Sequence, residues 1–166
     1  MTDASTSLDM STGLRKVAER AKREPAGRFH SLAHLIDEKL LASHAPGSIR
    51  PGQAILVATG WGRMWNKPGA VLRRPNFTKR AIAWLLRHKP FICGFDVPGM
   101  ESSWSEDVVE EKGGLLGMLF KKNVLLVAPL VNLEKVRADK GTLYCLPLPV
   151  AGTSGAPARV LFEERA

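Results

Sequence analysis

The sequence predicts an α/β fold, a mixed sheet with flanking helices that is preceded by a two-helix appendage. From residue 54 onward, short apolar runs alternate with helical segments of about ten residues, which is the pattern of α/β proteins. Before residue 45, apolar residues instead recur at three- and four-residue spacing, which indicates amphipathic helices. The Pro- and Gly-rich segment 44–52 separates these patterns, so we divide the chain into residues 1–45 and 46–166.

Each element follows from a local signal. The appendage is expected to contain helices at 12–23 and 31–44, the second capped by Ser31. In the larger part, apolar runs predict strands at 54–59, 91–95, 124–128, 142–148 and 158–163. Thr78 is expected to cap a helix that ends before Pro90, and a loop and helix are expected at 106–122.

The composition is that of a globular protein, with 45% hydrophobic and 24% charged residues in a chain of 166. The best apolar run, residues 124–131, is too short to span a bilayer, and the first residues lack the pattern of a secretory signal. We therefore expect a cytoplasmic protein without a membrane partner. Cys93 and Cys145 each lie in an apolar run, which predicts buried free thiols rather than a disulfide.

The net charge of +8 is unevenly distributed along the chain. Residues 46–95 contain nine basic and no acidic side chains, whereas residues 96–115 contain six acidic side chains against Lys112 alone. The basic block could attract phosphates, as on a nucleic-acid-binding surface. It could equally face the acidic block within the fold or across a dimer.

Several blocks of the larger part occur in an order that resembles a known family. They are GQAILVATGW (52–61), Trp65, FICGFDVP (91–98), VLLVAPLVNL (124–133) and LPLPVAGTSGAPAR (146–159). Over about residues 49–163 they resemble the C-terminal half of the cyclase family, which includes bacterial kynurenine formamidases and isatin hydrolases. The resemblance implies an α/β domain, usually dimeric, in which zinc or manganese activates water against an amide or lactam carbonyl. The reaction of N-formylkynurenine to kynurenine and formate is one example.

The metal ligands of that family do not transfer to this sequence. The family places its first ligands in a loop of the form H-x-G-T-H-x-D, and this string does not occur here. Leu116 or a neighbouring residue stands where a later His is expected, and Ala128 stands where a Glu is expected. We therefore expect a metal-dependent amide or lactam hydrolase-like protein that is inactive and binds no metal if these ligands are truly missing.

His30, His34 and Asp37 are the remaining metal-ligand candidates. On the expected helix 31–44 their spacing of four and three residues would place them on one side, and His-x-x-x-His is a true ligand spacing. The alternative is an ordinary amphipathic helix, because Asp37 comes one residue later than the Asp of the family string.

Trp61, Arg63, Trp65 and Asp96 are the candidate substrate-binding residues. They follow the first two strands of the larger part, and aromatic side chains at the carboxyl end of an α/β strand are well placed to line a pocket. In the cyclase family the corresponding loop borders the active site. The alternatives are packing of the tryptophans against the sheet or a partner, and a structural role for Asp96.

Residues 14–44 carry a second resemblance, to the opening of group II intron reverse transcriptase/maturases, which implies RNA contacts. The alternative function is therefore a non-catalytic binding or RNA-contacting protein, with five basic residues between Arg15 and Arg23 as the RNA-facing group. We also expect a homo-oligomer, because strands that are apolar on both faces leave sheet surface that needs cover.

Overall fold

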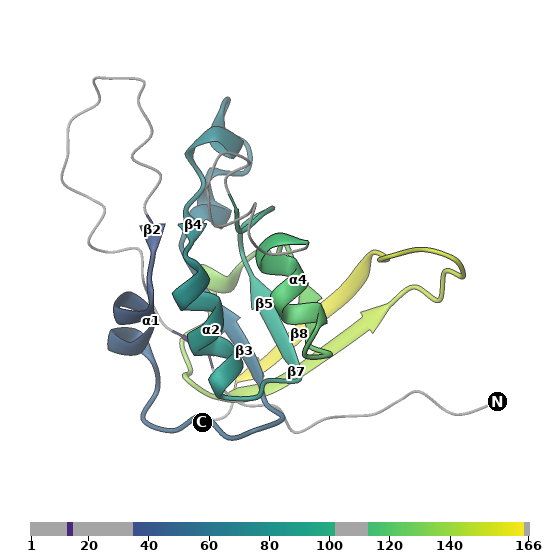
Figure 1. The fold of residues 1–166 in the computed structure, drawn as a ribbon. Helices are drawn as coiled ribbons and strands as arrows, with labels where there is room; N and C mark the ends of the chain where they lie inside the picture. The colour runs from purple at the N-terminus through teal and green to yellow at the C-terminus, as the bar shows by residue number, and fades with distance from the viewer. Residues whose placement is uncertain (1–12, 15–34, 102–112, 165–166) are drawn as a thin grey trace.

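The computed structural model describes residues 13–14, 35–101 and 113–164. Its centre is a parallel sheet in the order β1-β3-β5-β6. Figure 1 labels β3 and β5 of this sheet. Its strands are β1 (Gly13–Leu14), β3 (Ala54–Val57), β5 (Ile92–Phe95) and β6 (Leu125–Val127). Ile55 lies opposite Cys93, which fixes the register of the β3–β5 pair, and Gly94 lies opposite Val127, which fixes that of the β5–β6 pair.

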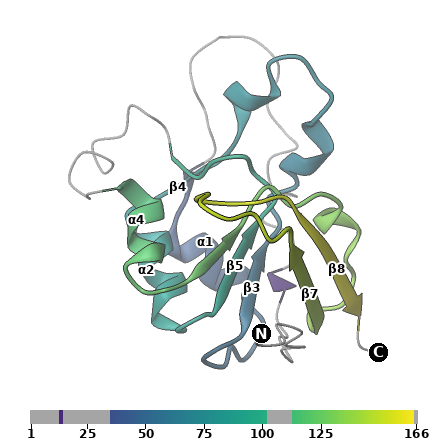
Figure 2. The same ribbon diagram turned by 90° about the vertical axis from the view of Figure 1, so that its right-hand side faces the viewer.

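Helices cover one face of this sheet, and a hairpin covers the other, as Figure 2 shows. The helices are α1 (Glu38–His44), α2 (Lys79–Arg87) and α4 (Gly114–Phe120). The antiparallel hairpin consists of β7 (Gly141–Pro147) and β8 (Ala158–Glu164). A small parallel pair, β2 (Leu35–Ile36) and β4 (Asn76–Phe77), lies beside the helices, and 3-10 turns occur at η2 (Trp61–Met64), η3 (Ala70–Arg73) and η4 (Leu133–Lys135). The predicted α/β class is confirmed.

The two layers follow from the alternation of side chains along the strands. Ile55 and Phe95 pack into the cluster on the helix face, whereas Leu56 and Ile92 pack into the cluster on the hairpin face. Every residue of β3 and β5 is buried, as expected for parallel strands that are covered on both sides. The continuous apolar runs that predicted these strands therefore reflect burial on both faces.

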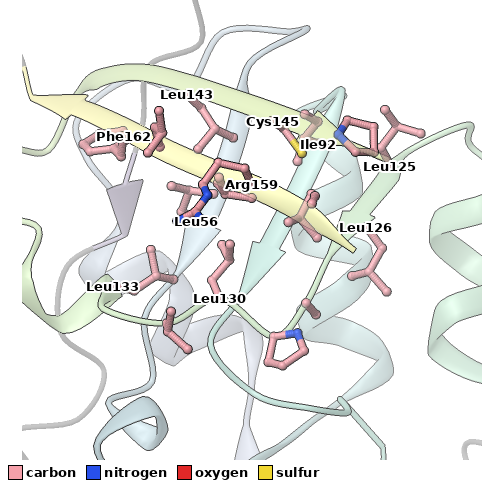
Figure 3. Close-up of a pocket in the computed structure, with 18 of the residues that line it drawn as sticks. Leu56, Ile92, Leu125, Leu126, Leu130, Leu133, Leu143, Cys145, Arg159 and Phe162 are labelled. Carbon is pink, nitrogen blue, oxygen red and sulfur yellow. The ribbon is translucent and has the colours of Figure 1, made fainter. Parts of the chain in front are cut away.

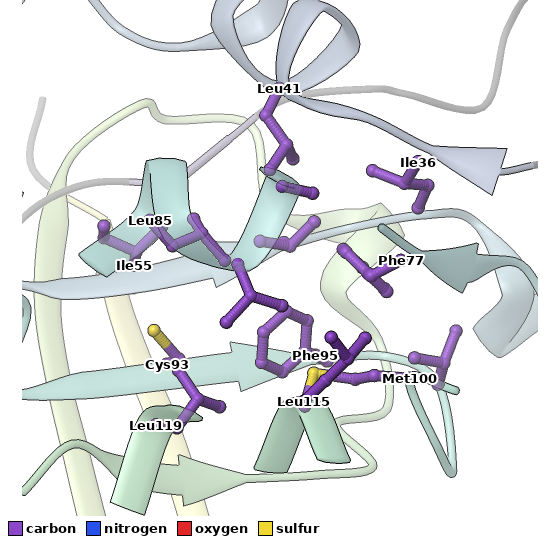
Figure 4. Packing of buried hydrophobic residues seen from close by; sticks show 14 of the residues in the cluster. Ile36, Leu41, Ile55, Phe77, Leu85, Cys93, Phe95, Met100, Leu115 and Leu119 are labelled. Atoms are coloured by element: carbon purple, nitrogen blue, oxygen red, sulfur yellow. The ribbon is translucent and has the colours of Figure 1, made fainter. Parts of the chain in front are cut away.

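Phe95 lies at the centre of the helix-side cluster (Figure 4). Its ring contacts that of Phe77 edge to face, with 5.1 Å between the centroids. Ile36 and Leu41 belong to the same cluster, although they precede the boundary proposed at residue 45. The described part of the N-terminal segment therefore shares the main core.

Helix α2 begins and ends where the sequence signals place it. The hydroxyl of Thr78 accepts a hydrogen bond from the backbone N–H of Ala81 at 3.0 Å, and this cap satisfies one free donor of the first turn. The chain leaves the helix at His88, two residues before Pro90.

Two of the predicted helices are wrong in part. Leu35–Ile36 form strand β2, because Ile36 is buried beside Phe77. Helix α1 begins only at Glu38, because Asp37 rather than Ser31 provides its cap. Gly13–Leu14 form strand β1 next to β3 instead of starting a helix at residue 12. The rest of the 12–23 prediction, and residues 102–112 of the predicted 106–122 segment, lie outside the described residues.

The cysteines are free, as predicted. Cys93 is buried between the sheet and the helices, and this burial raises the pKa of its thiol to about 12. Cys145 is only half-buried, which corrects the expectation that both thiols are interior. Within the described residues, no helix has the length and apolar character needed to cross a membrane.

Candidate functional site

The loops that follow β3 and β5 meet at the carboxyl edge of the sheet, where Asp96 joins them. The backbone N–H of Thr59 lies 3.0 Å from each Asp96 carboxylate oxygen, and the Thr59 hydroxyl donates to Oδ1 at 2.7 Å. The backbone N–H of Gly60 donates to Oδ2 at 2.8 Å. Both oxygens of Asp96 are therefore occupied by donors from the loop after β3.

Asp96 is completely buried. Burial raises the pKa of its carboxyl group, and the hydrogen bonds from Thr59, Gly60 and Gly62 lower that pKa to a smaller extent. A buried carboxylate is normally costly unless it is paired or hydrogen-bonded, and here the hydrogen bonds offset part of that cost. The arrangement is that of a carboxylate that shapes a loop.

The loop that Asp96 holds is tightly built. Gly60 adopts φ 79°, a left-handed conformation that glycine reaches without a steric penalty. The Thr59 hydroxyl then accepts the backbone N–H of Trp61 at 3.2 Å, and the Trp61 indole N–H donates to the carbonyl of Ala70 at 3.0 Å. These bonds fix the start of η2 and tie it to η3.

The three other predicted binding residues lie on η2 and just after it. Trp61 is 4% exposed and belongs to the helix-side cluster, so its ring mainly supports the loop. Trp65 is 40% exposed, and its ring contacts the ring of Trp61 edge to face with 5.0 Å between the centroids. Arg63 is exposed between them. The structure thus brings Trp61, Trp65 and Asp96 into one loop system and leaves Trp65 and Arg63 open to solvent.

Glu134 is a residue at this edge that the sequence analysis missed. It lies in η4, and a Cβ at Gly62 would stand 3.4 Å from its Oε2 and 4.0 Å from the Cβ of Asp96. Its Oε2 atom is buried without a hydrogen-bond partner in the described structure. The available signal was topological: the segment after β6 leaves the sheet at the same edge as those after β3 and β5.

Leu116 and Ala128 stand at the positions where the family resemblance expects a later His and Glu, and their roles in the structure differ from that of Asp96. Leu116 is in the first turn of α4, and its backbone N–H donates to Oε1 of Glu101 at 3.1 Å. Arg74 reaches the same segment by donating to the carbonyl of Glu101 at 2.7 Å. Ala128 follows β6 and faces the hairpin side of the sheet.

The candidate metal ligands of the N-terminal segment are only partly described. Asp37 caps α1, with its Oδ1 accepting the backbone N–H of Leu40 at 2.8 Å. His30 and His34 lie outside the described residues. Because Leu35–Ile36 are a strand, the single helical face proposed for His30, His34 and Asp37 does not exist.

A comparison with known protein families shows which family this chain is related to. A family model described as "Putative cyclase" matches residues 9–102, which is more than half of the chain. The chain belongs to this family. The match includes residues 14–44, so it covers the segment that also resembles maturases, and nothing in the comparisons supports the maturase resemblance.

Solved structures of cyclase-like hydrolases have a similar fold. A potential metal-dependent hydrolase with cyclase activity aligns at 23% identity and a TM-score of 0.63, over 81% of this chain and 62% of that one. An isatin hydrolase bound to the product analogue thioisatinate aligns at 26% identity and a TM-score of 0.63, over 77% of this chain and 52% of that one. A predicted metal-dependent hydrolase from Bacillus stearothermophilus aligns at 23% identity and a TM-score of 0.63, over 81% of this chain and 60% of that one. The chain therefore spans less than two thirds of each of these proteins, and a search of curated proteins found no match.

The described residues of this cyclase-family chain do not fit the metal ion that two of those descriptions imply. Among them, no group of three or more His, Cys, Asp or Glu side chains could hold a metal ion. The oxygens of Asp96 are taken by Thr59 and Gly60, and Asp37 is used as a helix cap. We derive no catalytic step through a metal at this edge.

Proposed function

We propose that this cyclase-family chain recognises a small planar amide or lactam at the loop after β3, without hydrolysing the C–N bond on its own. The observation that carries this proposal is that the Asp96 carboxylate is hydrogen-bonded to the loop after β3. Its two oxygens accept hydrogen bonds from Thr59 and Gly60, so the carboxylate builds the loop and is not free to act as a base or a metal ligand.

The loop itself supports recognition. The partly exposed ring of Trp65 is held against the buried ring of Trp61, so a flat aromatic compound has a pre-oriented surface to stack on. The exposed Arg63 lies within the same short turn and can donate hydrogen bonds to a carbonyl oxygen. An aromatic amide or lactam presents both features, a flat ring and a carbonyl.

The choice of this ligand class also rests on the relatives. The isatin hydrolase among the similar structures acts on a compound with a lactam fused to an aromatic ring. N-formylkynurenine, the substrate implied by the kynurenine formamidase resemblance, is an aryl amide of the same chemical class. Isatin and N-formylkynurenine are therefore the two probes to compare.

Binding and turnover are measured separately on the full chain. By calorimetry we expect isatin to bind, and Trp65→Ala to weaken this binding at least about tenfold, because it removes the exposed stacking surface. Trp84→Phe is the matched control, since Trp84 is a tryptophan buried on α2. With zinc or manganese added, hydrolysis of either probe should not exceed that of a protein-free sample.

Two results would contradict the proposal. Absence of binding by both probes, or binding that Trp65→Ala leaves unchanged, would remove the recognition site from this loop. Metal-dependent turnover well above the protein-free rate would instead identify the chain as a working hydrolase of the family.

A further inference from the structure

Basic side chains gather on the segment between β3 and β4 and on the start of α2. Figures 1 and 2 show this segment, in blue to teal, extending beyond the strands of the central sheet. Four of its basic side chains are exposed to solvent: Arg63, Lys67, Arg73 and Arg80. We call these four side chains, together with the exposed ring of Trp65, the basic surface.

Hydrogen bonds within the segment hold most of this surface in one conformation. The backbone N–H of Ala70 donates to the carbonyl of Lys67 at 3.1 Å, and the indole of Trp61 donates to the carbonyl of Ala70 at 3.0 Å. The guanidinium of Arg73 donates to the carbonyl of Pro68 at 3.0 Å. The turn that carries the basic residues is therefore fixed to η2 before any partner binds.

The position of Arg80 is not explained by the stability of its helix. It lies in the first turn of α2, which contains no acidic residue. The helix dipole favours acidic side chains at this end and disfavours basic ones. A basic residue here makes more sense as part of a surface that attracts an anion.

The acidic side chains close to the basic surface in the described structure are buried or already hydrogen-bonded. Both oxygens of Asp96 accept donors from the loop after β3, and Oε2 of Glu134 is buried. The carboxylate of Glu101 accepts a backbone N–H of α4. Residues 46–95 contain no acidic side chain at all. A surface with this excess of positive charge attracts polyanions.

The exposed tryptophan favours RNA over an acidic peptide as the polyanion. Trp65 rests edge to face on the ring of Trp61, so the exposed part of its ring is held in place beside the basic side chains. Sites for single-stranded nucleic acids combine basic side chains for the phosphates with aromatic rings on which bases stack. An acidic peptide offers no such flat group, and the bases of a duplex are already stacked on one another. RNA is the nucleic acid that proteins most often recognise through unpaired bases.

We propose that the basic surface binds single-stranded RNA without regard to its sequence. Arg63, Lys67, Arg73 and Arg80 contact phosphates, and one base stacks on Trp65. Phosphate contacts and stacking are open to every nucleotide, so neither selects a sequence. This inference goes beyond the recognition of an amide or lactam, and it does not depend on whether isatin binds.

The first test measures the salt dependence of RNA binding by the full chain. A fluorescein-labelled oligouridylate of about 15 nucleotides is followed by fluorescence anisotropy. Four phosphate contacts to a single strand predict that the affinity falls about fiftyfold between about 50 and 200 mM KCl. Lys67→Gln and Arg80→Gln should each reduce the slope of log affinity against log salt by about 0.7, because each removes one contact.

Arg159→Gln is the matched control for the loss of one positive charge. Arg159 lies on β8, where it lines the pocket between the hairpin and the sheet, as Figure 3 shows. It is exposed like Lys67 and Arg80, but it lies outside the basic surface. This variant should keep the affinity and the slope of the wild-type chain.

Stacking is tested separately from charge. Trp65→Ala should weaken binding of the oligouridylate at least about fivefold at every salt concentration and leave the slope unchanged, because it removes a stacking surface and no charge. Binding of an RNA duplex of the same length should not respond to Trp65→Ala, since paired bases do not stack on the ring.

Three outcomes would overturn the proposal. One is no binding of the oligouridylate, even at about 50 mM KCl. Another is binding that Lys67→Gln and Arg80→Gln weaken no more than Arg159→Gln, which would place the contact elsewhere on the chain. The third is displacement of the RNA by an equal concentration of a glutamate peptide of similar length, since the surface would then attract any polyanion.

Discussion

Replacing Asp96 by alanine is expected to lower the free energy of unfolding by about 3–5 kcal/mol, because several buried donors lose their acceptor and each such loss costs about 1–3 kcal/mol. The donors are the backbone N–H and hydroxyl of Thr59 and the N–H of Gly60. Asp96→Asn keeps the shape and one acceptor oxygen, so its loss should be clearly smaller. Urea denaturation of the three chains measures this order, and an Asp96→Ala chain as stable as wild type would contradict it.

The difference in stability between the wild-type chain and Asp96→Asn should change with pH in one direction. Burial raises the pKa of the Asp96 carboxyl above its ordinary value of 3.8, so the native state binds this proton at higher pH than the unfolded chain does. The contribution of Asp96 to the free energy of unfolding therefore increases as the pH falls from the pKa of this group in the native state toward its pKa in the unfolded chain. The wild-type chain should gain stability relative to Asp96→Asn over that interval. A relative loss on acidification would show that the hydrogen bonds outweigh burial.

Substituting Gly141 by alanine should destabilise the hairpin by about 1–3 kcal/mol, the usual cost of overpacking a filled core. A Cβ at this position would overlap the carbonyl oxygen of Glu163 and lie 2.6 Å from Cζ of Phe162. The overlap with backbone cannot be relieved by a rotamer change, so the two strands must separate. Gly155→Ala is the control, because a Cβ there meets nothing within 4 Å.

Thermal or urea unfolding of the two glycine variants distinguishes local packing from a general effect of the substitution. Gly155→Ala should be neutral or slightly stabilising, since alanine restricts the unfolded chain. Equal destabilisation by both variants would show that the close contact at Gly141 is not the reason why alanine destabilises the chain at this position.

Local signals predicted the elements of the larger part well. Runs such as 54–57 and 92–95 are apolar without interruption because both faces of the parallel sheet are covered, and Thr78 marks the start of α2 through its own hydrogen bond. The two-residue strands could not be predicted in this way. Leu35–Ile36 form a strand because they pair with Asn76–Phe77, about forty residues later in the sequence, and two residues have no periodicity of their own.

The candidate site was predicted in position but not in chemistry. The sequence placed Asp96 at the end of a strand beside the Trp61 loop, and the structure confirms that they meet. It could not show that Thr59 and Gly60 occupy both carboxylate oxygens, because that depends on the loop conformation set by the positive φ of Gly60. Glu134 was missed because it reaches the edge through η4, and no sequence spacing relates it to Gly62.

The central claim, that this cyclase-family chain recognises its ligand without a metal-activated water, is tested most directly by the metal content of the purified chain. After incubation with zinc or manganese and removal of free ion, elemental analysis should return far less than one metal per chain. One tightly held metal per chain, lost on His30→Ala or His34→Ala while the fold is kept, would contradict the claim and assign the ligand role to these histidines.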